Sequence, residues 1–116
     1  MKSLLILFVS LFIFSASYAQ TSQKVDVADT TKKIETVETA CGQCKFGLKG
    51  KGCDLAVRIN GKAYFVDGTA IDDHGDAHAE DGFCNSVRKA KVQGAVVNDR
   101  FKVTYFTLVK EEKKEQ

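Results

Sequence analysis

The spacing of four cysteines constrains this chain of 116 residues more than any other feature of its sequence. Two residues separate Cys41 from Cys44, eight separate Cys44 from Cys53, and thirty separate Cys53 from Cys84. A short exported chain keeps such a set as two disulfides, as a metal site or as a redox centre. The pattern therefore indicates where the chemistry lies and leaves three kinds of chemistry open.

The N-terminal residues 1–19 have the features of a secretory signal peptide. Lys2 is followed by an apolar run over 4–14, and Ser17-Tyr18-Ala19 ends the segment with the small residues that precede a cleavage point. The apolar run is too short to cross a bilayer comfortably. We therefore expect cleavage before Gln20, an exported protein that is periplasmic or secreted, and no stable membrane anchor after cleavage.

The charge balance excludes one large class of partner. The formal net charge is +2, and removal of residues 1–19 takes away one lysine and no acid. A nearly neutral chain lacks the basic face of a general nucleic-acid binder, so no nucleic-acid partner is expected. The sequence also shows no Ser-His-Asp order, no defined carboxylate pair and no phosphate loop. It favours a non-enzymatic protein and does not identify its partner.

The chain is long enough for one small domain. Residues 20–31 are polar without a clear period, which predicts a flexible linker. The tail, residues 110–116, is almost wholly charged. The domain is therefore expected over residues 32–109.

Alternation of apolar and polar residues predicts five strands in this domain. Asn60-Gly61 is a strong signal for a two-residue hairpin, and Asn98-Asp99 predicts a second turn. An acidic segment over 70–85 predicts a short helix or helical turns. The expected strands cover 34–40, 55–60, 62–67, 87–97 and 100–109. This order predicts an all-β fold with one short helical segment: a small OB-like five-stranded barrel, β-β-β-α-β-β.

The expected topology places the cysteines together. In an OB-like barrel the fourth strand lies antiparallel to the first, so the start of one lies near the end of the other. Cys41 and Cys44 end the first expected strand, Cys53 precedes the second, and Cys84 precedes the fourth. The fold therefore predicts that all four sulfurs meet at one end of the barrel.

Four short runs resemble an uncharacterised family of small exported bacterial proteins. They are CGQCKFG at 41–47, GCDLAV at 52–57, DDHGDAH at 72–78 and GFC at 82–84, followed by a closing segment AKVQG at 90–94. The resemblance covers roughly residues 37–109. It implies that the cysteines act as one unit in an OB-like fold, and it implies no particular reaction.

Motif context narrows the chemistry of Cys41, Cys44, Cys53 and Cys84. Haem attachment needs a histidine after the second cysteine, and Lys45 stands there. A thioredoxin-like centre needs a helix after the motif, whereas residues 45–52 are rich in glycine. Thiolates suit zinc and copper(I), and four can form a closed tetrahedral site. Two disulfides, favoured by an oxidising compartment, remain the alternative, and thiol–disulfide exchange is the third interpretation.

Two further segments carry weaker signals. His74 and His78 are four residues apart among several acids, and on a helix they would share a face and form a second metal site. The alternative is a solvated acidic loop, because Gly75 interrupts such a helix. Residues 45–52 alternate lysine with glycine, which suits an anion-binding nest or, more simply, a flexible turn.

Overall fold

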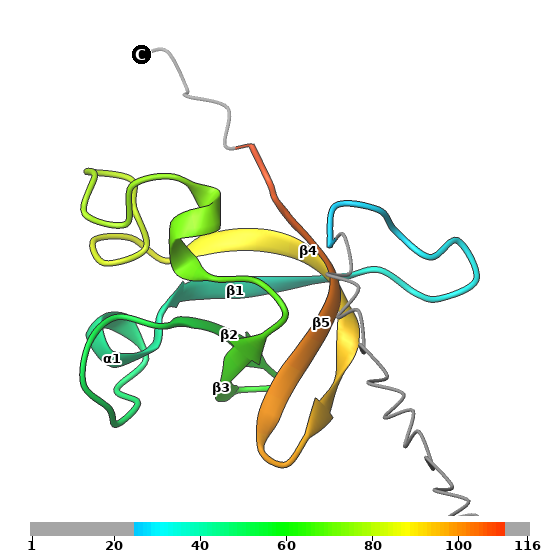
Figure 1. Ribbon diagram of the computed structural model, residues 1–116, viewed down its shortest axis with the longest axis horizontal. Coiled ribbons are helices and arrows are strands. Elements are labelled where there is room, and N and C mark those ends of the chain that lie inside the picture. Colours follow the sequence, from blue (N-terminus) through cyan, green and yellow to red (C-terminus); the bar gives the residue numbers. More distant parts are fainter. Residues whose placement is uncertain (1–24, 111–116) are drawn as a thin grey trace, which may run out of the picture.

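The computed structural model describes residues 25–110, and the predicted signal peptide lies outside the described residues. The chain forms a closed barrel of five strands in the order β1-β2-β3-β5-β4 (Figure 1). The strands are β1 (Glu35–Cys41), β2 (Leu55–Ile59), β3 (Lys62–Asp67), β4 (Arg88–Val97) and β5 (Arg100–Leu108). The predicted OB-like barrel is therefore confirmed, with strand boundaries within one or two residues of those expected.

The strand pairings have the antiparallel and parallel pattern that the topology requires. β1 lies antiparallel to both β2 and β4, with Cys41 opposite Leu55 and Val37 opposite Ala90. β3 and β5 pair in parallel through Val66 and Phe101. Closure of the sheet leaves no open edge strand and brings the end of β1 beside the segment that enters β4.

Two tight turns join the hairpins as predicted. Asn60 and Gly61 adopt φ values of 50° and 82° between β2 and β3, and Asn98 and Asp99 adopt 52° and 63° between β4 and β5. Positive φ at both central residues matches the twist of the flanking strands. Asparagine, aspartate and glycine tolerate this conformation better than other residues, which explains why the sequence marks both turns.

The helical turns predicted over 70–85 are confirmed, and one further helix was not predicted. The segment over 70–85 contains one 3-10 turn, η1 (Ile71–His74), which ends at Gly75, and turns follow it. A one-turn helix, α1 (Gly42–Lys45), begins directly after β1. Sequence reasoning missed α1 because the glycines after it argued against a helix. The helix does stop there, since Phe46 caps it and Gly47 has a φ of 67°.

The barrel interior holds one hydrophobic core. Its largest fully buried side chains include Phe83, Val57 and Val92, and Thr39 is buried with its hydroxyl donating to the Ala56 carbonyl at 2.8 Å. Within residues 25–110, every buried side-chain polar atom has a hydrogen-bond partner. Phe83 comes from the loop before β4, so its buried side chain anchors this loop in the core.

The described part of the predicted linker, residues 25–31, contacts the barrel. The buried Gln93 side chain donates to the carbonyls of Asp29 and Lys32 at 2.8 and 2.9 Å, and it accepts the Asp29 N–H at 2.8 Å. The Phe106 N–H donates to the Val25 carbonyl at 2.8 Å. These bonds join the described part of this stretch to β4 and β5.

Candidate metal centre

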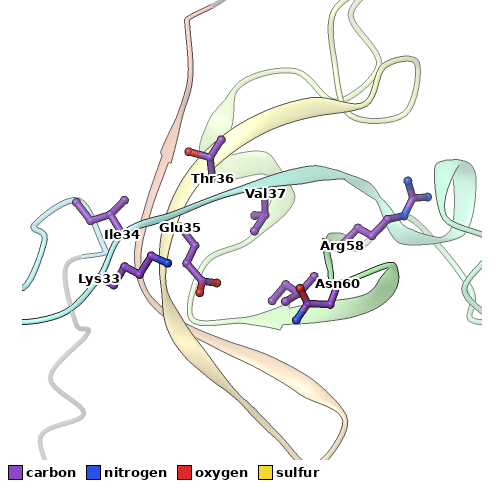
Figure 2. Close-up of a pocket in the computed structure, with 8 residues that line it drawn as sticks. Lys33, Ile34, Glu35, Thr36, Val37, Arg58 and Asn60 are labelled. Atoms are coloured by element: carbon purple, nitrogen blue, oxygen red, sulfur yellow. The ribbon is translucent and has the colours of Figure 1, made fainter.

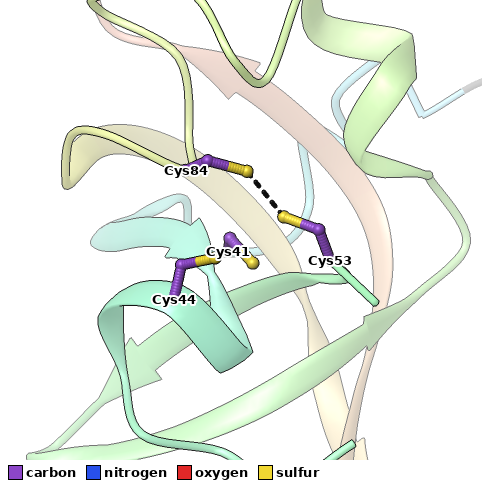
Figure 3. Close-up of side chains that lie close together, drawn as sticks. All are labelled: Cys41, Cys44, Cys53 and Cys84. Atoms are coloured by element: carbon purple, nitrogen blue, oxygen red, sulfur yellow. Dashed lines mark hydrogen bonds between the residues drawn. The ribbon is translucent and has the colours of Figure 1, made fainter. Parts of the chain in front are cut away.

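Four cysteine sulfurs converge at one end of the barrel (Figure 3). The Sγ atoms of Cys41, Cys44, Cys53 and Cys84 all lie within 4.8 Å of one another. Within the described residues, this is the one group of three or more cysteine, histidine or carboxylate side chains close enough to hold an ion. The predicted clustering of the four sulfurs is therefore confirmed.

Each cysteine comes from a different part of the fold. Cys41 is the last residue of β1, Cys44 lies in α1, Cys53 precedes β2, and Cys84 lies in the loop before β4. The N–H of Cys41 donates to the Phe83 carbonyl at 3.0 Å, which holds the Cys84 segment against the end of β1. Barrel closure thus joins residues that are far apart in the sequence.

The four thiols differ in exposure. Cys41 is fully buried, with 0% of its surface exposed, whereas Cys53 and Cys84 are half-buried and Cys44 is exposed. No disulfide joins any two of them in the described structure. The Sγ atoms of Cys53 and Cys84 lie 2.7 Å apart, and they form the sulfur contact drawn in Figure 3. The cluster therefore has a buried inner side at Cys41 and an open outer side at Cys44.

Hydrogen bonds among the cysteines shift their pKa values in different directions. Burial acts to raise its pKa, but hydrogen bonds from the Cys53 thiol and from the backbone N–H groups of Gln43 and Cys44 outweigh burial and lower it. The Cys44 pKa is raised, chiefly because its thiol donates to Cys41. Burial raises the pKa of Cys53, and its bonds to Cys41 and Cys84 add to that rise. The pKa of each of these three thiols therefore depends on the neighbouring sulfurs.

Close packing determines the residue between Cys41 and Gln43. A Cβ atom at Gly42 would lie 2.7 Å from Phe65 Cε1 and 3.1 Å from the Ala56 Cβ. Glycine lets α1 approach the sheet closely enough for the Gly42 N–H to donate to the Asp54 carbonyl at 2.8 Å. The first turn of the site is therefore seated directly on β2 and β3.

The predicted histidine site is not assembled. Gly75, with a φ of 102°, ends η1 directly after His74, so no helix aligns His74 with His78. His74 is half-buried: its ring centroid lies 4.5 Å from that of Phe106, and its Nε2 is 2.9 Å from the Thr69 hydroxyl. His78 is exposed. The picture of two surface histidines on a solvated loop is thus wrong for His74, because packing on Phe106 shields it from water.

A pocket whose lining contains none of the four cysteines is shown in Figure 2. It encloses about 400 Å³ beside the start of β1 and the end of β2. Of its charged groups, Arg58 is paired with Glu38 at 2.6 Å and lies over the Phe46 ring. The lining residues are Lys33, Ile34, Glu35, Thr36, Val37, Arg58, Ile59 and Asn60. Nothing in this set forms a nucleophile, an acid–base pair or a ligand cluster.

The lysine-glycine segment after α1 folds back over it. The Leu48 N–H donates to the Gly42 carbonyl at 3.0 Å, and the backbone at Gly50 packs against the Gln43 side chain. Leu48 and Gly50 therefore hold the segment beside the cysteine cluster, while its lysines are exposed.

Comparison with known proteins places the chain without assigning an activity. No helix in residues 25–110 has the length and apolar character needed to cross a membrane. No curated protein and no solved structure gives a match. A family of unknown function matches residues 35–109, a range that contains all five strands and all four cysteines. The chain therefore belongs to the DUF6370 family of unknown function.

Proposed function

We propose that this protein is an exported, non-enzymatic metal-binding module whose four cysteines hold one soft ion, zinc or copper(I). The observation that carries the proposal is the convergence of Cys41, Cys44, Cys53 and Cys84 within 4.8 Å. Export rests on the signal-like residues 1–19.

The sulfur geometry supports one ion bound by all four cysteines. A tetrahedral zinc–thiolate centre has Zn–S bonds of about 2.3 Å, which sets neighbouring sulfurs about 3.8 Å apart. All sulfur pairs lie within 4.8 Å, so small side-chain rotations bring them to this spacing. Copper(I) is a softer ion that fewer thiolates satisfy, and the fourfold arrangement favours zinc.

The surroundings of the cluster support ligand chemistry. Backbone N–H groups of Gln43 and Cys44 act to lower the pKa of the Cys41 thiol, against the effect of its burial. Metal-bound cysteines are thiolates, so these donors favour the charged form that an ion needs. Lysines on the adjacent segment add positive charge around a centre whose thiolates exceed the charge of the ion.

The first alternative, two disulfides, requires only that the four cysteines form two separate bonded pairs. A stapled domain needs each pair to be close but does not need the two pairs to meet, whereas a single ion requires all four sulfurs at one point. Thiol–disulfide exchange lacks its usual support, because α1 has only four residues. Both alternatives predict different masses from those of a metal complex, and they are therefore outcomes of the same experiment.

Intact mass spectrometry of the mature protein, isolated from the exported fraction, tests the proposal. We expect one metal ion under native conditions and four alkylatable thiols after denaturation. A mass lower by four hydrogens with no metal would assign two disulfides and overturn the proposal. A mixed, readily reduced population would assign exchange chemistry instead. Loading with zinc and with copper(I) separately then identifies the preferred ion.

A further inference from the structure

Resting on the proposed function, we infer that the ion leaves the centre through Cys44, to a thiolate acceptor that carries an acidic surface. The centre is then a transfer site whose exit is defined by one ligand. The inference joins two independent observations: the unequal exposure of the four cysteines and the unpaired lysines beside the exposed one.

The exposure of the ligands defines one open side. Cys41 lies behind the strand end with 0% exposure, and Cys53 and Cys84 are half-buried. Cys44 is exposed and lies in a helix of four residues. An incoming group can therefore reach the ion beside Cys44 without moving a strand. Displacing Cys41 first would require opening the end of β1.

The transfer is a ligand exchange that leaves all oxidation states unchanged. The acceptor thiol loses its proton and forms a bond to the ion, and the bond between the ion and Cys44 Sγ breaks. Cys44 then takes up a proton as a free thiol. The remaining bonds exchange in turn, so no oxidant or reductant takes part.

The lysines next to Cys44 provide a docking surface for the acceptor. Residues 42–53 contain three lysines and no acid. Lys45, Lys49 and Lys51 are exposed, and within the described residues none of them forms an ion pair. The bonds that fold the segment over α1 keep this charge beside the exit ligand. Unpaired like charges around a reactive centre favour a partner of opposite charge and speed its encounter.

Pulse alkylation tests the exit ligand. Zinc-loaded protein is mixed with a dithiol peptide acceptor, exposed briefly to excess maleimide at increasing times, and mapped by peptide mass spectrometry. We expect Cys44 to be the first cysteine labelled, at a rate about tenfold above that of each of the other three. First labelling of Cys53, Cys84 or Cys41 would overturn the assignment of the exit.

Two peptide acceptors test the docking surface. Both carry one Cys-x2-Cys turn, flanked by glutamates in one peptide and by lysines in the other. The charged flanks also change the reactivity of the peptide thiols. The measured quantity is therefore the ratio of the transfer rates to the two peptides, and this ratio is compared between the wild-type protein and Lys45→Gln/Lys49→Gln/Lys51→Gln. We expect the preference for the acidic peptide to fall about tenfold in the variant at low salt.

A matched variant and a salt series complete the test. Lys33→Gln/Lys91→Gln/Lys102→Gln removes three exposed lysines elsewhere and should keep the wild-type rate ratio. About 1 M salt should abolish the difference between wild type and variant. A rate ratio that is unchanged in the first variant overturns the docking surface, even if its zinc affinity falls. Failure to retain zinc at all would instead refute the proposed function, and native mass measurement before mixing separates the two failures.

Discussion

Gln43 and Asp54 hold each other by two hydrogen bonds across the cysteine centre. Gln43 Nε2 donates to Asp54 Oδ2 at 2.7 Å, and the Asp54 N–H donates to Gln43 Oε1 at 2.9 Å. Gln43 lies between the first two cysteines of the sequence, and Asp54 directly follows Cys53. The pair therefore fixes the position of one ligand segment relative to the other without contributing a ligand.

Replacing Gln43 with alanine should weaken metal binding and leave the barrel folded. Partners that position metal ligands typically contribute tenfold to hundredfold in affinity, and we expect Gln43→Ala to lower zinc affinity by about that factor. Competition with a chromophoric chelator measures it. Thr107→Ala, an exposed polar deletion on β5, is the control and should bind as the wild type does. Equal affinities in the two variants would show that the Gln43–Asp54 pair does not position the ligands.

Gly42→Ala should destabilise the protein through overpacking. Its new methyl group would meet Phe65 Cε1 at 2.7 Å and Leu48 Cδ1 at 3.0 Å. Extra volume in a packed site typically costs about 1–3 kcal/mol in the free energy of unfolding. Gly47→Asn is the control, because nothing lies within 4 Å of that position and asparagine tolerates its φ of 67°. Denaturant unfolding should separate the two variants, and a similar midpoint for both would contradict the packing argument.

The sequence predicted what local patterns encode. Alternating residues and the turns at Asn60-Gly61 and Asn98-Asp99 sufficed for the strand order, and the strand order sufficed to bring Cys84 to Cys41. These signals depend on neighbouring residues and on barrel closure, so a single sequence carries them.

The parts that sequence reasoning missed depend on distant partners. The turn α1 persists because Gly42 packs on Phe65 and because Gln43 binds Asp54, and helix propensity reports neither contact. His74 is shielded because β5 supplies Phe106, which follows it by more than thirty positions in the chain. Gly42, which lies between Cys41 and Cys44, was the one local sign that α1 packs closely on the sheet.

The packing of His74 predicts a pH dependence of stability. Burial lowers its pKa below the ordinary 6.5; Asp73 opposes this shift and Arg88 adds to it. The unfolded chain therefore binds the proton more readily, and the stability that neutral His74 contributes is present above about pH 6.5 and lost as the pH falls below it. The melting temperature of the wild type minus that of His74→Asn should shrink from about pH 7.5 to about pH 5.

Comparing the two proteins at each pH cancels the titration of the other groups that they share. His78→Asn removes an exposed imidazole and controls for the substitution itself; at neutral pH it should change stability by less than about 0.5 kcal/mol. A wild-type minus His74→Asn difference that grows on acidification would mean that His74 is stabilised in its charged form.

Cys84→Ser should remove most of the stabilisation that zinc gives and do little in its absence. Serine nearly preserves the shape of the side chain and leaves the hydrogen bond from the residue 84 N–H to the Ala77 carbonyl at 3.0 Å in place. An ion at a hundred times its dissociation constant stabilises the folded state by about 2.7 kcal/mol, and loss of one of four ligands removes most of this. His74→Ala should show the opposite behaviour, a lower melting temperature without zinc and a normal gain with it, because its ring packs on Phe106. Thermal melts of both variants with and without zinc, beside Ser86→Ala from the same loop, measure the contrast. A full zinc-dependent gain in Cys84→Ser would remove Cys84 from the ligand set and leave a three-cysteine centre.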